Sequence, residues 1–172
     1  NKFLANIREC AAIVHVVRCF DDENVIHVEG STNPIRDIDI IDLELIMADV
    51  EMADRRIDKA TKAAKADKKF LHEAEVFQGL RDWLNDGKSA RSYPCDEEEK
   101  AILATSDLLT LKPVIFAANL DEAGFKDHDN NPYYQAVVQA AEKEGAQVIP
   151  ICANIEADIA QMDPEDLSLI HI

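Results

Sequence analysis

The chain has 172 residues with 18 lysines and arginines against 34 aspartates and glutamates, so its formal net charge at neutral pH is −16. Hydrophobic residues make up 47% and charged residues 30%, a composition that excludes an intrinsically disordered chain. The length fits one domain with an insertion. The negative charge disfavours a protein that covers nucleic acid or an anionic membrane with most of its surface, but it permits a local basic patch.

No apolar run approaches the ~20 residues needed to cross a bilayer, and the N-terminus lacks a signal-peptide pattern. We therefore expect a cytoplasmic protein with no membrane partner. Four cysteines occur without any Cys-x-x-Cys pair, which favours small buried thiols over a disulfide framework or a zinc site. They are Cys10, Cys19, Cys95 and Cys152.

The first elements in chain order are the end of a helix and a strand. Residues 1–9 carry Phe3, Leu4 and Ile7 at helical spacing and end in a break. Residues 11–17 are almost continuously apolar and rich in β-branched side chains. This pattern predicts a strand covered on both faces, as in a parallel sheet flanked by helices.

Residues 34–110 differ in kind, because they predict an antiparallel helical hairpin inserted into the α/β domain. Pro34 opens a long helix with apolar residues alternately three and four positions apart, a coiled-coil heptad pattern. These residues are Leu43, Ile46, Val50, Ala53, Ile57, Ala60 and Ala64. After a break near residue 66, the pattern continues on a second helix with Phe70, Ala74, Phe77, Leu80 and Leu84.

The charge is concentrated at the turn of this hairpin. Residues 55–69 contain seven lysines and arginines and two aspartates, a local charge of +5 that leaves −21 for the other residues. A basic end on an acidic body is expected where only that end contacts phosphate. A solvated lysine-rich helix face is an equally acceptable interpretation of the run by itself, because no aromatic residues alternate with the lysines.

Two further strands and two helices follow. Residues 113–118 and 147–153 predict buried strands, the second at a sheet edge because Pro150 cannot donate a ladder hydrogen bond. Between them, Asn131, Pro132 and Gly145 mark the N-cap, first residue and stop of a helix with Tyr134, Val137, Val138 and Ala141 on one stripe. A last helix begins near residue 154, with Ile155, Ile159 and Met162 facing inward.

Strands that alternate with helices predict right-handed parallel crossovers and an α/β fold, of which this chain holds about half a doubly wound sheet. Ligands of such sheets bind beyond the carboxyl ends of the strands. Asn119-Leu120-Asp121-Glu122 stands at such an end. A side-chain amide there can connect neighbouring loops and still offer a donor and an acceptor in one plane. The alternative is that Asn119 only caps the strand and Glu122 only begins a helix.

This four-residue stretch occupies the place of the Asn-Lys-x-Asp base-recognition motif of P-loop GTPases and resembles its altered form in the YchF (Obg-like ATPase) family. Residues 1–9, 13–22 and 150–159 and the inserted hairpin also resemble that family. The resemblance covers residues 1–166. It implies a partial P-loop NTPase fold and, for the full-length protein, a ribosome-associated enzyme that hydrolyses ATP, or GTP, with Mg²⁺.

The resemblance assigns base binding to Asn119, Leu120 and Glu122, with Cys152 and Ala153 as backbone support. Glu122 is one methylene longer than the aspartate that reads guanine, and Leu120 replaces the lysine, so guanine selectivity should be lost. Asn119 can pair with adenine N6 and N7, as Asn does in DNA recognition. Leu120 is then expected to cover one face of the base. Asp21 and Asp22 are expected only to order their loop.

The resemblance also divides the chain. It predicts a nucleotide-binding segment at 1–33, a coiled-coil insertion at 34–110 and a second nucleotide-binding segment at 111–166. Residues 167–172 depart from the family and are predicted to be a non-native tail. The chain contains neither Gly-x-x-x-x-Gly-Lys-Ser/Thr nor Asp-x-x-Gly, so catalytic residues and magnesium ligands are expected upstream of Asn1 and the chain alone is expected to be inactive.

The expected partner is the ribosome, in contact with the basic hairpin end through ribosomal RNA, and the protein is expected to be a monomer. The contact residues assigned to this role are Arg55, Lys59, Lys62, Lys65 and Lys69. The alternative from a different functional class is a non-catalytic module in which the hairpin binds RNA or protein and the α/β part serves as a platform.

Overall fold

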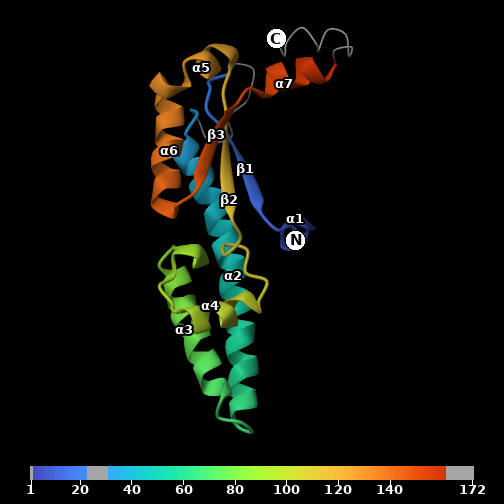
Figure 1. The fold of residues 1–172 in the computed structure, drawn as a ribbon, viewed down its shortest axis with the longest axis vertical. Helices are drawn as coiled ribbons and strands as arrows, with labels where there is room; N and C mark the ends of the chain where they lie inside the picture. The colour runs from blue at the N-terminus through green and yellow to red at the C-terminus, as the bar shows by residue number, and fades with distance from the viewer. Residues whose placement is uncertain (1, 23–30, 162–172) are drawn as a thin grey trace. The chain divides into compact units, whose positions relative to one another are not determined.

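A computed structural model describes residues 2–22 and 31–161 (Figure 1). The predicted tail at 167–172 and Met162 lie outside the described residues. The elements in order are α1 (Lys2–Arg8), β1 (Ile13–Arg18), α2 (Pro34–Ala64), α3 (Phe70–Asn85), η1 (Ala90–Ser92), α4 (Glu97–Ala104), β2 (Val114–Asn119), α5 (Glu122–Lys126), η2 (His128–Asn130), α6 (Pro132–Glu144), β3 (Gln147–Ile151) and α7 (Ala153–Ala160).

The chain divides into two compact units. The helical unit comprises residues 1–13 and 38–114, and the sheet unit comprises residues 14–37 and 115–172. This division puts α1 with the hairpin rather than with the sheet. Within the described residues, no helix is both long enough and apolar enough to cross a membrane.

The sheet has the order β1-β2-β3 and is parallel. β2 and β3 pair in parallel with Phe116 opposite Val148 and Ala118 opposite Pro150. Between β1 and β2, the N–H of Ile13 donates to the carbonyl of Pro113, and the N–H of Cys19 donates to the carbonyl of Asn119. Both partners of the second bond lie six residues after those of the first, so β1 and β2 are also parallel. β3 is therefore an edge strand of the described sheet, which confirms the position predicted from Pro150.

One face of the sheet is buried and the other is open along β1. Val17 and Phe116 are each 1% exposed, and the His15 ring lies 5.6 Å from that of Phe116. On the opposite face Val14 and Val16 are 60% and 58% exposed. The prediction that this strand is covered on both faces is thus wrong for the described chain, because side chains alternate across a strand and only one set finds a partner.

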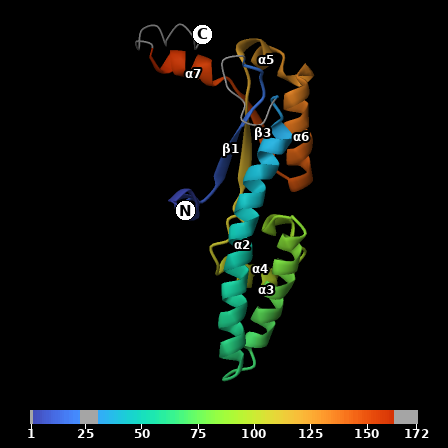
Figure 2. The same ribbon diagram turned by 180° about the vertical axis from the view of Figure 1, so that it is seen from behind.

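Helix α6 has the predicted ends. The Asn131 side chain accepts hydrogen bonds from the N–H groups of Tyr133 and Tyr134, and Pro132 opens the helix. Gly145 ends it in the left-handed conformation at φ 65°, which a residue without Cβ adopts without strain. Figures 1 and 2 show α6 beside β3. In α7, Ile155 and Ile159 are only half-buried, so the predicted inward face is weak.

The helical unit is built on α2 and α3, joined by a short turn. Its core contains the predicted Ile46, Ala53 and Ile57 of α2 and Phe77 and Leu80 of α3. The prediction is wrong for Leu43, which is 56% exposed on the outer face of α2.

A third helix, α4, was absent from the sequence prediction. Leu103 at its end and Leu108 beyond it complete the same core. Asp96 and Glu99 form a reciprocal capping box at its N-terminus. Their Asp-x-x-Glu spacing is the signal that could have revealed the helix.

A buried carboxylate fixes the segment before β2. Asp49 of α2 is 0% exposed and accepts hydrogen bonds from the N–H groups of Leu109 and Thr110 and from the Thr110 hydroxyl, at 2.6–2.8 Å. Burial raises the pKa of Asp49, while these hydrogen bonds and Arg8 act in the opposite direction. The three donors offset part of the cost of burying the charge.

Replacing Asp49 with alanine should therefore destabilise the chain. The substitution leaves two buried backbone N–H groups without acceptors, and we expect a loss of about 2–4 kcal/mol in the free energy of unfolding, measured by urea denaturation. Glu51→Ala, an exposed acidic position on the same helix, should change stability by less than about 0.5 kcal/mol. Equal stability of the two variants would contradict the anchoring role of Asp49.

Candidate functional site

The carboxyl ends of the three strands are tied together at Asn119. Its backbone carbonyl accepts from the N–H of Cys19 at 2.7 Å, and its side-chain Oδ1 accepts from the N–H of Ala153 at 3.1 Å. The next residue, Leu120, donates its N–H to the carbonyl of Ile151 at 2.8 Å. Asn119 thus connects the ends of β1 and β3 from the middle strand, as the sequence predicts.

This bond also orients the amide. Because Oδ1 faces an N–H donor, the opposite orientation would set Nδ2 against that donor and is disfavoured. Among the described residues, Nδ2 has no recorded hydrogen-bond partner, and Oδ1 can accept a second hydrogen bond. The amide can therefore still present a donor and an acceptor to a planar ligand.

Leu120 differs from its predicted position. Its side chain is 1% exposed and lies under α5, where its Cδ2 is 3.4 Å from the place that a Cβ on Gly124 would occupy. It cannot cover the face of a base in this arrangement. An apolar side chain directly after a strand packs inward here, and Leu120 forms the floor beneath the strand end.

Both carboxylates of the motif already have partners. Asp121 caps α5 by accepting from the N–H of Gly124 at 2.7 Å. Glu122 begins α5 and pairs with Lys126 at 2.9 Å, with both side chains largely exposed. Glu122 thus begins a helix, as the alternative interpretation of the sequence expects, and its role in base recognition stays a prediction. Lys126 was missed from the sequence, although a glutamate and a lysine four positions apart favour this pair.

The residues after β3 form the other side of the site. Cys152 is 3% exposed, and its carbonyl accepts from the N–H of Glu156 at 3.0 Å. Ala153 is exposed and contacts Asn119 through its backbone. Both positions offer backbone groups here, and their role as backbone support for a base stays a prediction from the resemblance.

The loop after β1 is held by a tyrosine that the sequence did not single out. The Tyr133 hydroxyl donates to the carboxylate of Asp21, 3.0 Å from either oxygen. This hydrogen bond to Asp21 is the main cause that raises the pKa of Tyr133. The expected loop-ordering role is confirmed for Asp21.

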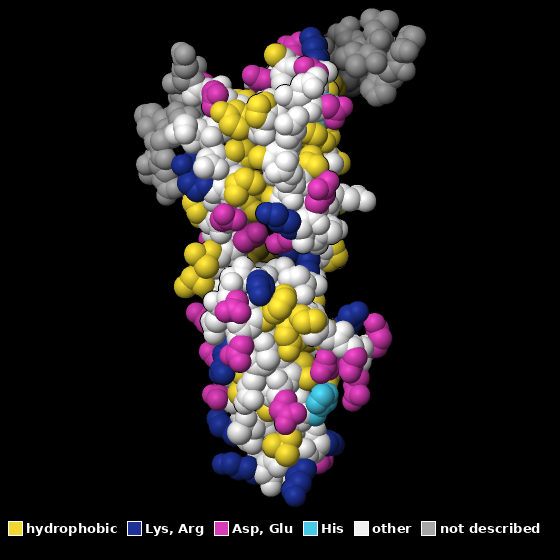
Figure 3. Space-filling view, turned by 90° about the vertical axis from the view of Figure 1, so that its left-hand side faces the viewer, with side chains coloured by type: hydrophobic (Ala, Val, Ile, Leu, Met, Phe, Trp, Pro, Cys, Tyr) yellow, Lys and Arg dark blue, Asp and Glu magenta, His cyan; other side chains and the backbone are white. Residues whose placement is uncertain are grey.

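The hairpin turn presents the predicted basic end. Figure 3 shows Lys and Arg side chains gathered at the end of the hairpin. The five residues assigned to ribosome contact are all exposed: Arg55, Lys59, Lys62, Lys65 and Lys69. Lys69 is the most constrained of them, because it lies 3.1 Å from Asp67 and over the ring of Phe70.

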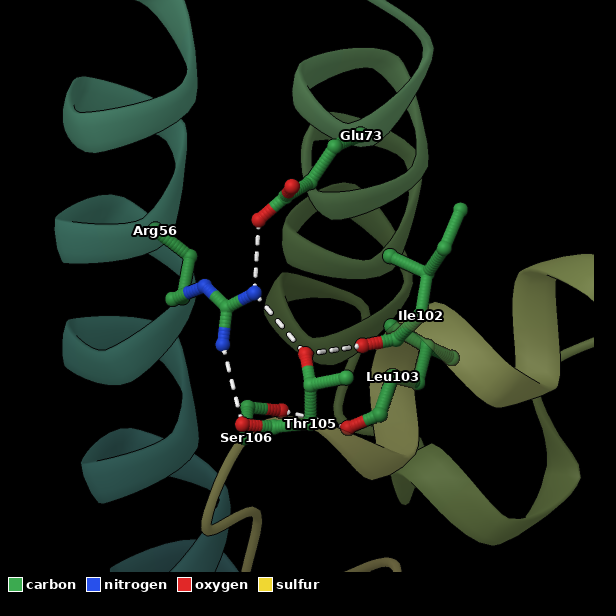
Figure 4. A network of polar contacts seen from close by, with 6 residues as sticks. All are labelled: Arg56, Glu73, Ile102, Leu103, Thr105 and Ser106. Carbon is green, nitrogen blue, oxygen red and sulfur yellow. Dashed lines mark hydrogen bonds and ion pairs between the residues drawn. The ribbon is translucent and has the colours of Figure 1, made fainter. Parts of the chain in front are cut away.

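Arg56 belongs to the fold rather than to this basic surface. Its guanidinium donates to Glu73 at 2.6 Å and to the hydroxyl and carbonyl of Thr105 at 2.9 and 3.1 Å (Figure 4). It also lies 4.8 Å from the centre of the Phe77 ring. The guanidinium of Arg56 therefore connects α2 with α3 and with the end of α4, and its charge is compensated inside the helical unit.

Across residues 2–22 and 31–161, no group of three or more His, Cys, Asp or Glu side chains lies close enough to hold a metal ion.

The fold is that of a P-loop NTPase of the YchF type. The solved structure of the Schizosaccharomyces pombe YchF GTPase matches 96% of this chain with a TM-score of 0.83 and 30% sequence identity, over 46% of its own length. A scan of protein-family models found no match.

The sequence is similar to curated proteins named ribosome-binding ATPase YchF. Identity is 44% over 167 residues for those of Haemophilus influenzae and Escherichia coli O157:H7, and 41% over 167 residues for that of Bacillus subtilis. Each match covers 96% of this chain. The chain is a YchF homologue that spans a little under half the length of these relatives.

Cysteine reactivity tests how the strand ends are packed. Burial, with a smaller contribution from Asp37, raises the pKa of the Cys19 thiol to about 12, so almost no thiolate forms at neutral pH. Cys152 is buried and Cys10 exposed. We expect a chromogenic disulfide reagent at pH 8 to modify Cys10 first, and Cys19 and Cys152 only after denaturation. Rapid modification of Cys19 in the folded protein would contradict this packing.

Proposed function

We propose that this chain supplies the base-binding site and the ribosome-contacting arm of a YchF-type nucleotide hydrolase, which in its full-length form hydrolyses ATP, or GTP, to the diphosphate and phosphate. The observation that carries the proposal is the Asn119 amide, which Ala153 holds at the carboxyl ends of three parallel strands. Its Nδ2 makes no hydrogen bond with any of the described residues. The YchF relatives named as ATPases support the nucleotide class.

Adenine suits this site better than guanine. The Nδ2 of Asn119 can donate to N7 of a purine, and the second lone pair of Oδ1 can accept from the adenine N6 amino group. Guanine carries an oxygen acceptor at that position and needs a carboxylate for its N1 and N2 donors. Asp121 and Glu122 already bind Gly124 and Lys126, so neither carboxylate is free to serve guanine without losing its partner.

The remaining assigned residues shape the site. Leu120 forms its floor, and the backbone of Cys152 and Ala153 closes the side next to β3. Glu122 is one methylene too long to take the place of the aspartate that reads guanine. The chain contains no phosphate-binding loop, so positioning and charge stabilisation of the transferred phosphoryl group fall to residues outside it, and the chain alone should be inactive.

The basic hairpin end supports a contact with ribosomal RNA. Arg55, Lys59 and Lys62 share one face of α2, because positions four and seven apart are neighbours on a helix, and Lys65 and Lys69 follow at the turn. Ammonium and guanidinium groups bind phosphate, and residues 55–69 contain no aromatic side chain on which a base could stack. The same surface also fits the second candidate, a non-catalytic RNA-binding module.

Replacing Asn119 with alanine should weaken ATP binding by the full-length protein about 5- to 100-fold, because a two-bond contact with a base is worth about 1–3 kcal/mol. Fluorescent-nucleotide titration measures the effect, and Asn85→Ala, an exposed amide on α3, is the matched control. The unmodified protein should bind ATP more tightly than GTP. Equal affinity for the two nucleotides, with both variants folded, would contradict this assignment.

Replacing Lys62, Lys65 and Lys69 with glutamate should abolish co-sedimentation of the full-length protein with ribosomes at about 0.1 M salt, where screening is still moderate. A matched variant with the same change in charge replaces the exposed Lys2, Lys100 and Lys143 and should retain most binding. Equal loss in both variants would show a general effect of net charge and not a contact at the hairpin end. If ribosome binding survives while ATP binding is absent, the non-catalytic module is the better description.

A further inference from the structure

An apolar groove runs between α1 and α2 in the helical unit. It has a volume of about 390 Å³ and is lined by Leu4 of α1 and by Ile40, Leu43, Met47 and Ala48 of α2. Ile40, Leu43 and Met47 are 47%, 56% and 62% exposed, and Phe3 of α1 is 47% exposed. Exposed apolar side chains at this density on one helix face are unusual for a surface that faces only water.

The groove is continuous because of helical spacing. Ile40, Leu43 and Met47 are three and then four positions apart, so they lie above one another on one face of α2. Leu4 and Ile7 of α1 pack beside Leu45 and Ala48, which brings the two helices together and forms the other wall. The core of the helical unit uses an adjacent face of α2, which includes Ile46 and Ala53, so the groove is a second apolar face.

The rim of the groove is acidic. Glu44 and Glu51 are among its lining residues. From residue 39 to residue 54, α2 contains six acidic side chains and no lysine or arginine. Asp49 is buried and Asp54 pairs with Arg81 of α3 at 3.3 Å, so Glu44 and Glu51 are the acidic side chains known to border the groove. Such a surface repels nucleic acid and anionic membranes.

We propose that this groove binds a basic amphipathic helix of a partner protein. A helix laid in a groove contributes apolar residues at positions i, i+3, i+4 and i+7, and the stripe of Ile40, Leu43 and Met47 offers the matching contacts. Lysines and arginines on the flanks of that helix would face Glu44 and Glu51. The flexible side chain of Met47 adapts to partner side chains of different shape. This surface shares no residue with the base site or with the basic hairpin end.

The test uses the full-length protein and a fluorescein-labelled peptide of leucine and lysine, with leucines at helical spacing along one face. Binding is measured by fluorescence anisotropy at physiological ionic strength. A peptide of the same composition in scrambled order, and one with glutamate in place of lysine, separate the amphipathic pattern from charge alone. We expect the patterned basic peptide to bind at least tenfold more tightly than either of these.

Variants locate the binding surface. Leu43→Ala combined with Met47→Ala should weaken peptide binding about tenfold or more, as expected when central anchors of an interface are truncated. Leu71→Ala on α3, which is 49% exposed outside the groove, should change it less than twofold. None of these substitutions changes the charge. Equal binding of the scrambled peptide, or no loss in the double variant, would overturn the proposal.

The rate of maleimide labelling in the groove tests whether the protein's own chain or a second copy of the protein fills it instead. In a Cys10→Ser background, Met47→Cys should react with a maleimide, and saturating peptide should slow that reaction at least fivefold. Protection without peptide at every protein concentration would mean that the protein's own chain fills the groove. Protection that grows with protein concentration would mean that a second copy does. Either result would overturn the proposal.

Discussion

The parallel pairing of β2 between β1 and β3 is the constraint on which the sheet unit depends. Because all three strands run in the same direction, their carboxyl ends meet at one edge, and the loops that leave them must pass each other there. Backbone groups at such an edge need partners that the ladder no longer supplies. Asn119 provides them for Cys19 and Ala153, so the residue that closes the edge also carries an amide whose Nδ2 has no partner in the described part of the chain.

In the proposed base site, both carboxylates of the motif already have partners within the chain. Asp121 caps α5 and Glu122 pairs with Lys126, both within a few residues of sequence. The exposed ion pair is worth only about 0.3–0.5 kcal/mol, so it does not by itself exclude guanine. The longer reach of Glu122 and its place at the start of α5 matter more, since they direct its carboxylate along the helix. The proposed preference for adenine therefore depends on an amide that suits adenine and on carboxylates that are directed away from the donors of guanine.

Helix α2 carries opposite charges at its two ends. Acidic residues crowd its first half, and lysines and arginines crowd its last turns, an arrangement that the helix dipole favours. A single helix can therefore present a surface for phosphate at one end and a surface for a basic protein segment at the other. The net charge of −16 hides this separation, because it adds two surfaces of opposite sign.

Much of the fold and part of the candidate site could be predicted from local sequence. The N-cap at Asn131, the stop at Gly145 and the edge position of β3 each depend on one residue's backbone chemistry, and each was confirmed. The basic hairpin end was also visible, because charge density needs no tertiary contacts. The α/β class followed from the alternation of strands and helices.

Only the tertiary structure decided which side of an apolar pattern is buried. The heptad pattern predicts that Leu43 and Ile46 are both buried. Leu43 is nevertheless exposed, because α3 and α4 cover just one face of α2. Leu120 shows the same limit, because it was expected over the face of a base but its side chain is buried under α5. Arg56 lies in the basic run 55–69, yet its guanidinium binds Glu73 and Thr105 inside the helical unit. The sequence by itself determined the elements, their ends and their charge. Burial and pairing depend on residues far apart in the chain, so only the folded structure could decide them.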